Sequence, residues 1–373
     1  MARRFNPKTR FASGLLFTLL LPVFTADATS ATDVLAQPSA MTRQASHAVL
    51  LAVTRAGDRL VAVGERGVLL LSDDNGGQWR QVQVPVSVTL TAVQFVDARQ
   101  GWAIGHSGVV LHSTDGGESW TLQLDGRQAA ALELAAAQAA LAASTEGAQR
   151  RLASAERLVA DGPDKPWLAL QFSDARHGLV VGAYGLALAT RDGGQTWQSW
   201  MGRIPNAQGL HLYAVGQAGA TFYLAGEQGL LLRSRDGGES FETLASPYEG
   251  SYFSLALEAD GALLVGGLRG KLFRSRDQGE HFEALDNPVP VSLGAAARVG
   301  SQVYWLNQAG GLLRSEEGSA RLQPLPSPPG PPLIAVAPAA DGALVGVGFA
   351  GTARLSMPVA NALSRSPAHV AVE

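Results

Sequence analysis

The most frequent candidate for chemistry in this sequence is an aspartate in a glycine-rich turn, where it could bind a metal ion or act as a general acid. Each copy reads Ser/Thr-x-Asp-x-Gly-x-x-Trp/Phe. The aspartate and aromatic residue of the five copies are Asp74 and Trp79, Asp115 and Trp120, Asp192 and Trp197, Asp236 and Phe241, and Asp277 and Phe282. An aspartate in a tight turn also accepts hydrogen bonds from nearby backbone N–H groups, and glycine supplies positive φ. Because a motif that recurs along the chain cannot form one active site, we expect these Asp boxes to be structural.

The elements around each Asp box repeat as well. Seven segments contain a Gly-x-x-Gly turn before an apolar stretch, with Asn307 in place of the first glycine in the degenerate sixth copy, and the second glycines are Gly67, Gly108, Gly185, Gly229, Gly270, Gly310 and Gly351. Five of the six separations lie between 40 and 44 residues. Each unit accommodates four short strands, A to D, with the Gly-x-x-Gly turn between B and C and the Asp box between C and D. This period predicts an all-β fold, a seven-bladed β-propeller of four-stranded blades.

The order of strands in a blade separates two faces of the ring. The Asp-box turns share one face with the A–B turns, and the B–C turns share the other with the connections from strand D to the next strand A. We expect function on this second, more variable face. Its B–C turns carry Glu65, Arg66, His106, Tyr184, Glu227 and Arg269, and its D-to-A connections carry Arg203, Tyr248, Glu249 and Tyr252. Aromatic, arginine and glutamate side chains on one rim are typical of a protein-binding surface.

One separation is longer than the others and marks an insertion at residues 125–165, between blades two and three. Residues 127–160 are rich in alanine with Leu, Glu, Gln and Arg, which favour helix. Ser144 to Gly147 could divide the segment into a helical hairpin. We expect it on the same variable face, as a lid over the central opening, as an arm offered to a partner or as a passive insertion.

The N-terminal residues predict export of the protein. Basic residues precede an apolar stretch from Phe11 to Phe24, and small residues follow, so we expect a signal peptide at residues 1–28, with a second cleavage site as late as residue 36. The mature chain is then periplasmic and not inserted in a membrane. Residues 29–46 are a candidate for the outer strand that blade seven lacks. The propeller covers 47–356, and 357–373 form a tail.

Composition removes several classes of function. The 373 residues include no cysteine, which excludes disulfides and thiol catalysis. The formal net charge is −3 with no long basic run, so we expect no nucleic-acid partner. The seven histidines show no metal-ligand spacing, and we expect neither a metal nor another cofactor.

The whole-unit pattern is F-x-D-x-x-x-G-W-x-x-G-x-x-G-x-x-x-x-S/T-x-D-G-G-x-x-W, which Phe95 to Trp120 match and Phe172 to Trp197 nearly match. With this pattern the chain resembles the photosystem II stability/assembly factor family of Asp-box propellers and its relatives in non-photosynthetic bacteria. The resemblance implies a non-catalytic periplasmic or lumenal propeller that binds protein and helps to assemble or support a membrane complex. For the non-photosynthetic relatives it implies a membrane transporter as partner.

A second family leaves an alternative open. Gly202-Arg203-Ile204-Pro205 is similar to the Arg-Ile-Pro motif of sialidases, which are also Asp-box propellers. Arg66, Arg269, Tyr184 and Glu227 could complete such a site, and Glu65 with Glu227 could form a glycosidase pair. No motif ties these residues together. The alternative is therefore a carbohydrate-active enzyme or a glycan-binding protein, and we assign no catalytic residue.

Overall fold

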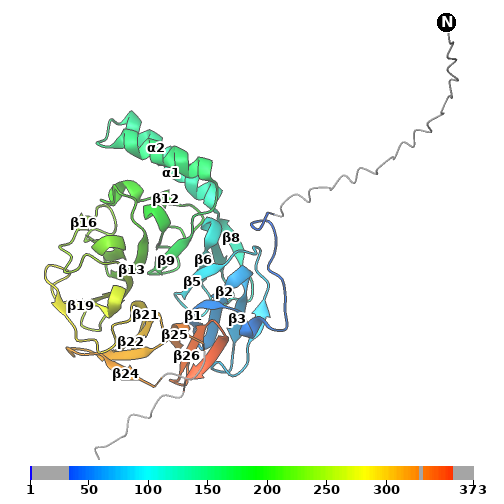
Figure 1. The fold of residues 1–373 in the computed structure, drawn as a ribbon, viewed down its shortest axis with the longest axis vertical. Coiled ribbons are helices and arrows are strands. Elements are labelled where there is room, and N and C mark those ends of the chain that lie inside the picture. Colours follow the sequence, from blue (N-terminus) through cyan, green and yellow to red (C-terminus); the bar gives the residue numbers. More distant parts are fainter. Residues whose placement is uncertain (2–32, 327–330, 356–373) are drawn as a thin grey trace, which may run out of the picture. The chain divides into compact units, whose positions relative to one another are not determined.

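The computed structural model describes Met1, residues 33–326 and residues 331–355. The chain divides into two units, Met1–Thr32 and Asp33–Glu373, and all described helices and strands belong to the second. That unit is a ring of seven antiparallel sheets around a common centre (Figure 1). Six sheets have four strands and the last described sheet has three. The prediction of a seven-bladed propeller with a helical insertion is confirmed.

Each blade takes its strands in sequence order from the centre outward, as a meander. Blade one consists of β1 (Leu50–Ala56), β2 (Arg59–Gly64), β3 (Leu69–Ser72) and β4 (Arg80–Val82). Blade two consists of β5 (Leu90–Phe95), β6 (Gly101–Gly105), β7 (Val110–Ser113) and β8 (Thr121–Leu124). Blade three consists of β9 (Trp167–Phe172), β10 (Gly178–Gly182), β11 (Ala187–Thr190) and β12 (Gln198–Ser199). Blade four consists of β13 (Leu212–Ala218), β14 (Thr221–Gly226), β15 (Leu231–Ser234) and β16 (Glu242–Thr243). Blade five consists of β17 (Tyr252–Leu257), β18 (Leu263–Gly267), β19 (Leu272–Ser275) and β20 (Glu283–Ala284). Blade six consists of β21 (Leu293–Val299), β22 (Gln302–Asn307), β23 (Leu312–Glu316) and β24 (Gln323–Leu325). Blade seven has the described strands β25 (Leu333–Pro338), β26 (Leu344–Gly348) and β27 (Gly351–Leu355).

The helices lie in the connections. The two α-helices are α1 (Gly126–Ala142) and α2 (Ala148–Asp161). The 3-10 turns are η1 (Ala45–His47), η2 (Glu65–Gly67), η3 (His106–Gly108), η4 (Ala183–Gly185), η5 (Met201–Arg203), η6 (Glu227–Gly229) and η7 (Leu268–Gly270). A capping box starts α1: the carboxylate of Asp125 accepts from the N–H of Gln128, whose side chain accepts from the N–H of Asp125.

The hydrophobic core is divided among the spaces between neighbouring blades. Seven clusters of buried side chains each join residues of two adjacent blades. In the cluster between blades two and three, for example, Trp102 and Phe172 stack with ring centroids 3.8 Å apart. Because a single sheet can bury only what its neighbour covers, the blades depend on one another for stability.

The ring closes where blade seven meets blade one. Strand β25 lies against β1, and Val345 and Val347 pack with Leu50 in one cluster. We expect residues 29–46 to supply the outer strand of blade seven, but residues 33–46 form no strand in the described sheets. Instead, Ser39 exchanges hydrogen bonds with Val84 at the outer edge of blade one.

The helical hairpin packs on the outside of the ring. It lies beside β12, away from the centre (Figure 1), which rules out the lid over the central opening among the three alternatives. One carboxylate anchors it: Glu133 of α1 is 1% exposed, pairs with Arg151 of α2 at 2.8 Å and accepts a hydrogen bond from the Ser199 hydroxyl of β12. The hairpin is therefore fixed to blade three.

The predicted signal peptide and the C-terminal tail 357–373 lie outside the described residues. Among the described helices, none is both long and apolar enough to cross a membrane.

Candidate protein-binding face

The B–C turns form one face of the ring, and an equivalent backbone hydrogen bond holds each of the seven turns in place. The first turn residue donates its N–H to the carbonyl of the residue that precedes strand A. The seven pairs are Glu65 and Val49, His106 and Thr89, Ala183 and Pro166, Glu227 and His211, Leu268 and Ser251, Gln308 and Ser292, and Phe349 and Pro332. We name this surface the B–C face. The Asp-box turns lie opposite, where Gly116, Gly193 and Gly237 donate to the A–B turns of their own blades.

Five B–C turns hold a residue other than glycine in the left-handed region. These residues are Arg66 (φ 51°), Ser107 (56°), Tyr184 (57°), Gln228 (51°) and Arg269 (57°). Left-handed backbone costs a residue with a Cβ about 1 kcal/mol relative to its relaxed conformation. Glycine would relieve this cost at every turn. These five turns therefore carry side chains in a conformation that glycine adopts without strain.

The two carboxylates of these turns hold the local backbone. Glu65 accepts a hydrogen bond from the N–H of Val49 at 2.9 Å. Glu227 accepts from the N–H of His211 at 2.8 Å and from the hydroxyl of Tyr213 at 3.3 Å. Both carboxylates thus accept hydrogen bonds that fix the start of strand A in their own blades.

The cations of the face are free to contact a partner. Arg66 and Arg269 are exposed, and neither side chain forms an ion pair or hydrogen bond with another residue in the described ranges. The His106 side chain is also exposed. Large exposed apolar residues join them: Tyr184 and Phe349 are each 56% exposed. The B–C face thus combines unpaired arginines with aromatic side chains, the composition of protein-binding surfaces.

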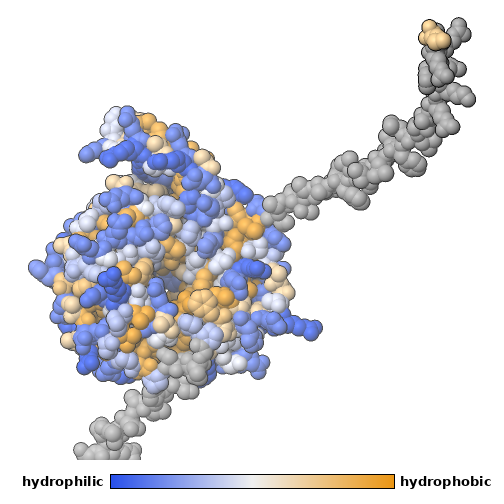
Figure 2. All heavy atoms as spheres, viewed as in Figure 1, coloured by the Kyte–Doolittle hydropathy of each residue, from blue (hydrophilic) through white to orange (hydrophobic). Residues whose placement is uncertain are grey.

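The innermost strands line the central opening in an equivalent way. Each strand A has a β-bulge after its first residue. The second residue, which is only partly buried or exposed, is Leu51, Thr91, Leu168, Tyr213, Phe253, Gly294 or Ile334. The opening therefore has a mainly apolar lining near the B–C face. Figure 2 shows hydrophobic residues beside the hollow at the centre of the ring.

The predicted residues of the D-to-A connections separate in the structure. Glu249 is exposed and Tyr248 half-buried, in a loop that contacts the B–C turn at Gly229. Tyr252 is fully buried and donates to or accepts from the Ser246 hydroxyl, and burial raises its pKa to about 12. It belongs to the core between blades four and five, so the prediction for Tyr252 is corrected.

Arg203 is also placed elsewhere than predicted. Its guanidinium donates to the carbonyl of Gly238 at 3.0 Å and pairs with Glu239 at 3.1 Å, both in the Asp-box turn of blade four. Its guanidinium also lies 5.0 Å from the centroid of the Trp200 ring. Arg203 joins two blades on the side of the Asp boxes, and the structure does not bring it together with Arg66, Tyr184 or Glu227.

The Asp boxes use their polar atoms within their own turns. In all five, the aspartate accepts from the box hydroxyl and from the N–H four residues on, as in Asp236 with Ser234 (2.8 Å) and Ser240 (3.0 Å). The hydroxyl and N–H of Ser240 hold the pKa of Asp236 well below its usual range. The aromatic residue packs into the cluster shared with the preceding blade, as Trp120 does. These contacts fit a structural role.

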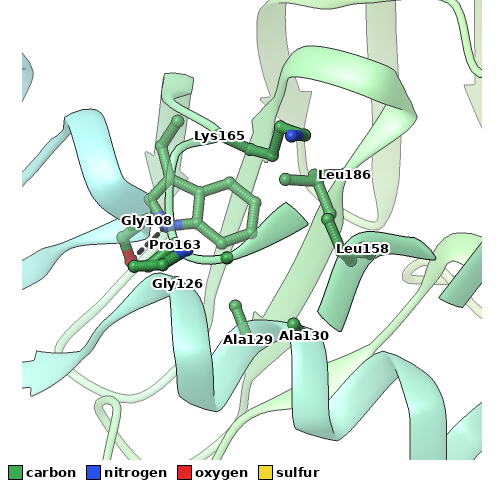
Figure 3. A pocket seen from close by; sticks show the side chains of 10 residues that line it. Gly108, Gly126, Ala129, Ala130, Leu158, Pro163, Lys165 and Leu186 are labelled. Atoms are coloured by element: carbon green, nitrogen blue, oxygen red, sulfur yellow. Dashed lines mark hydrogen bonds between the residues drawn. The ribbon is translucent and has the colours of Figure 1, made fainter. Parts of the chain in front are cut away.

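Enclosed space near the hairpin is small. A cavity of about 10 Å³ lies between α1, α2 and blades two and three, and Ala129, Leu158, Lys165 and Leu186 line it (Figure 3). This space is about that of a single water molecule. In the part of the chain that the structure describes, no cluster of three His, Asp or Glu residues could hold a metal ion.

Sequence reasoning missed the residues of the central lining, above all Tyr213 and Phe253. Alignment of the seven strands A would have found them, because each follows the first buried residue of its strand. Their exposure results from the bulge, which no sequence motif marks.

Comparison with known proteins identifies relatives. The model of a family described as photosynthesis system II assembly factor YCF48 matches residues 73–138 and 159–285. The photosystem II assembly lipoprotein Ycf48 of Synechococcus sp. (strain CC9902) is 35% identical over 63 residues, 16% of this chain and 19% of the relative. The photosystem II assembly protein Ycf48 of Thermosynechococcus vestitus (strain NIES-2133 / IAM M-273 / BP-1) is 34% identical over 50 residues, 13% of this chain and 14% of the relative. The chain thus aligns with less than a fifth of either curated relative.

Solved structures share the fold. YCF48 bound to D1 peptide has a TM-score of 0.61 and 18% identity, over 84% of this chain and 94% of that chain. YCF48 from Cyanidioschyzon merolae has a TM-score of 0.58 and 16% identity, over 82% and 94%. The WD40 β-propeller domain of Doa1 reaches a TM-score of 0.58 at 12% identity, over 86% and 94%. At these identities the likeness supports the propeller fold.

Proposed function

Since this chain belongs to the photosystem II assembly factor family described as YCF48, we propose that it is a non-catalytic binding factor that helps to assemble or support a membrane protein complex. The B–C face contacts a polypeptide of that complex. The protein acts in the periplasm after removal of its signal peptide. That this complex is a membrane transporter remains a prediction from the family resemblance.

One observation carries the proposal. Five B–C turns keep a side chain in a left-handed conformation that glycine would adopt without strain, and two of these side chains are arginines without a partner among the described residues. On the opposite face, the Asp-box carboxylates are bound within their turns. Unsatisfied cations beside exposed aromatic residues favour binding to a protein surface over catalysis.

The relatives support the same kind of role. One solved family member is described as bound to a D1 peptide, and the two curated relatives are named as photosystem II assembly proteins. The Synechococcus relative is a lipoprotein, whereas none of the 373 residues here is a cysteine that could carry a lipid.

The helical hairpin extends the binding surface sideways. Its first helix starts against the B–C turn of blade two, where a Cβ on Gly108 would lie 2.5 Å from the Cα of Gly126. From there α1 runs along the outer edge of blade three. A partner bound across blades two and three would thus meet both surfaces.

The test is affinity capture from the producing organism's own membranes with paired variants. The double variant Arg66→Ala/Arg269→Ala removes the unpaired cations of the B–C face. The matched control, Arg99→Ala/Arg176→Ala, removes two exposed arginines from A–B turns on the opposite face. Both changes lower the charge equally, and neither touches a buried contact.

We expect the unchanged protein and the control to retain one membrane complex, and the B–C variant to lose at least about tenfold of it, as is typical when interface arginines are removed. Equal capture by both variants would contradict the assignment of the binding face. Loss in both variants alike would show a nonspecific charge effect and would also contradict it.

A further inference from the structure

The Asp box of blade one contains a dipeptide that is prone to spontaneous chemical modification. Asn75 is followed by Gly76, and no other Asn-Gly pair occurs in the 373 residues. Asparagine deamidates most readily before glycine, because the missing side chain leaves the glycine nitrogen free to attack the amide carbon of the asparagine. At the position of Asn75, three of the other four boxes hold glycine and the fourth, in blade five, holds Gln278. Among the five boxes, this chemistry is therefore confined to blade one.

The backbone at this position is left-handed in all five boxes. Asn75 and Gln278 both have φ 61°, and the three glycines have φ between 73° and 76°. Asparagine is one of the few residues that enter this region routinely. The box of blade five is a matched comparison, because attack of the next nitrogen on Gln278 would close a six-membered ring, which forms more slowly than the five-membered ring at Asn75. The two boxes thus share a backbone and differ in reactivity.

Blade seven holds Asn75 in place across the seam where the ring closes. The side-chain Oδ1 accepts a hydrogen bond from the N–H of Asp341 at 3.3 Å, and the backbone carbonyl accepts one from the guanidinium of Arg354. Gly76 packs on the same blade, since a Cβ there would lie 2.8 Å from the side chain of Val345. The contacts that fix the Asn-Gly pair therefore depend on the closed ring.

The nitrogen that would attack is also engaged. The N–H of Gly76 donates to the hydroxyl of Ser72 at 2.9 Å, within the Asp box. This nitrogen has to lose its hydrogen and approach Cγ of Asn75 before it can react. Its bond to Ser72 and the bond from Asp341 to the side chain must therefore both break first. A closed seam keeps both reacting groups bound, and local opening of the seam releases them.

We propose that Asn75 is a deamidation site whose rate is set by the closure of the ring between blades seven and one. In the opened seam, the nitrogen of Gly76 bonds to Cγ of Asn75, and the side-chain nitrogen leaves as ammonia with the proton of Gly76. Solvent water then opens the resulting succinimide at one of its two carbonyls and gives aspartate or isoaspartate.

The isoaspartate product should weaken the seam. It adds one carbon to the main chain between Asp74 and Gln78, whose N–H donates to the Asp74 carboxylate at 2.8 Å. The carbonyl that Arg354 binds then becomes part of a carboxylate outside the main chain. Both the Asp box and the closing contact lose their geometry. The modification does not depend on the partner or on the proposed function.

The test follows deamidation of Asn75 by peptide mapping and mass spectrometry while the purified protein is kept at mildly alkaline pH. Arg354→Ala should raise the rate at least about fivefold, because loss of a closing contact increases the fraction of molecules with an open seam. Arg276→Ala, at an exposed arginine in the Asp box of blade five, should leave the rate within about twofold. A synthetic peptide of residues 72–79 should react faster than the unchanged protein.

The matched variant Asn75→Gln tests the consequence for stability. It gives blade one the side chain of blade five and keeps the backbone carbonyl that Arg354 binds. After ageing, the unchanged protein should unfold at a lower urea concentration in proportion to its isoaspartate content, whereas Asn75→Gln should keep its midpoint.

Three results would overturn the inference. The first is an equal rate in the unchanged protein and Arg354→Ala, including the absence of product in both. The second is a rate in the unchanged protein that matches that of the peptide, because the ring would then give no protection. The third is accumulation of isoaspartate with no change in the urea midpoint, which would show that the modification leaves the seam intact.

Discussion

The guanidinium of Arg354, in the last described strand of blade seven, donates a hydrogen bond to the backbone carbonyl of Asn75 in the Asp-box turn of blade one. This bond closes the ring through a side chain. The same relationship recurs between neighbouring blades, from Arg59 to Gly116, Gln123 to Gly193, Arg203 to Gly238, Arg233 to Gln278 and Arg274 to Ser319. The turn at the Asp-box position thus accepts a hydrogen bond from the preceding blade, and in the five blades with an Asp box the aspartate binds a backbone N–H group of the same turn.

Removal of the closing contact should destabilise the ring. We expect Arg354→Ala to lower the free energy of unfolding by about 1–2 kcal/mol, because it deletes a charged hydrogen bond to Asn75 and the pair with Asp341. Urea unfolding measures the change. Arg276→Ala is the control, since Arg276 is exposed and its ion pairs among the described residues lie within blade five, and it should change stability by less than about 0.5 kcal/mol. Equal effects would contradict a special role of the closing contact.

The contact between blades five and six contains a buried charge pair. Arg274 and Glu258 are each 1% exposed in their side chains and lie 2.9 Å apart. We expect Arg274→Met to cost about 3–5 kcal/mol, because it leaves the Glu258 carboxylate buried without its cation. Arg314 occupies the same strand position in blade six, whose neighbour has no Asp box. Arg314→Met should cost less than half as much by thermal or urea unfolding.

The stability should depend on pH through His112. Burial lowers the pKa of His112 below its ordinary value of 6.5. The ring stacks on Trp102 and contacts Gln100 and Gln123. Above pH 6.5 both the folded and the unfolded chain hold it neutral. Below that pH the unfolded chain binds the proton more readily, so the stability contributed by His112 is lost as the pH falls.

The measurement compares Tm at pH 7.5 and pH 5 for the unchanged protein and for His112→Gln. The variant cannot gain a charge at this position, so its Tm should fall less over the same interval. An equal fall in both proteins would show that other groups cause the pH dependence.

The Asp boxes should set the acid limit of the fold. Hydrogen bonds from the backbone N–H and ring of His281 hold the pKa of Asp277 well below 3.8. The stability that the ionised carboxylate contributes is present above its unfolded pKa and is lost as the pH falls towards its folded value. Asp277→Asn should therefore reduce the loss of stability during acid titration between pH 5 and pH 2, followed by circular dichroism. An unchanged acid transition would contradict this account.

The hairpin should be removable. A Cβ on Gly126 would lie 2.8 Å from Pro163, so the two ends of the insertion already meet. We expect deletion of residues 127–161 to leave the propeller folded, with a decrease in Tm because Ala129 and Leu158 leave the cluster between blades two and three. Near-ultraviolet circular dichroism and capture of the membrane complex give the two readouts. Unchanged capture would show that the hairpin is not a contact.

The sequence predicted the fold because the repeat itself encodes it. The Gly-x-x-Gly turns and Asp boxes mark two of the three turns in a blade, and their spacing defined seven blades and the insertion. The outer strand of blade seven could not be predicted in this way, because that blade has no Asp box. Residues 33–46 carry no repeat motif that would indicate which strand they contact, and the contact of Ser39 with Val84 depends on tertiary packing.

The candidate site was predicted less completely. B–C turn residues such as Arg66 and Tyr184 were found because topology alone places those turns on one face. Arg203 and Tyr252 were misplaced because a connection of several residues can send a side chain to either face or into the core. The ring contacts of Tyr184 with His211 and of Tyr213 with Phe253 were missed because these residues come from three blades and meet only in the ring.

The most direct test of the central claim is photo-crosslinking in the producing cells. A benzophenone amino acid would replace Ser107, Gln228 or Arg269 on the B–C face, or Arg99 or Arg176 on the opposite face. We predict crosslinks to one membrane-associated polypeptide from the B–C positions and none from the A–B positions. Crosslinks from Arg99 and Arg176 alone, or the same weak crosslinks from all five positions, would contradict the proposal that the B–C face binds the partner.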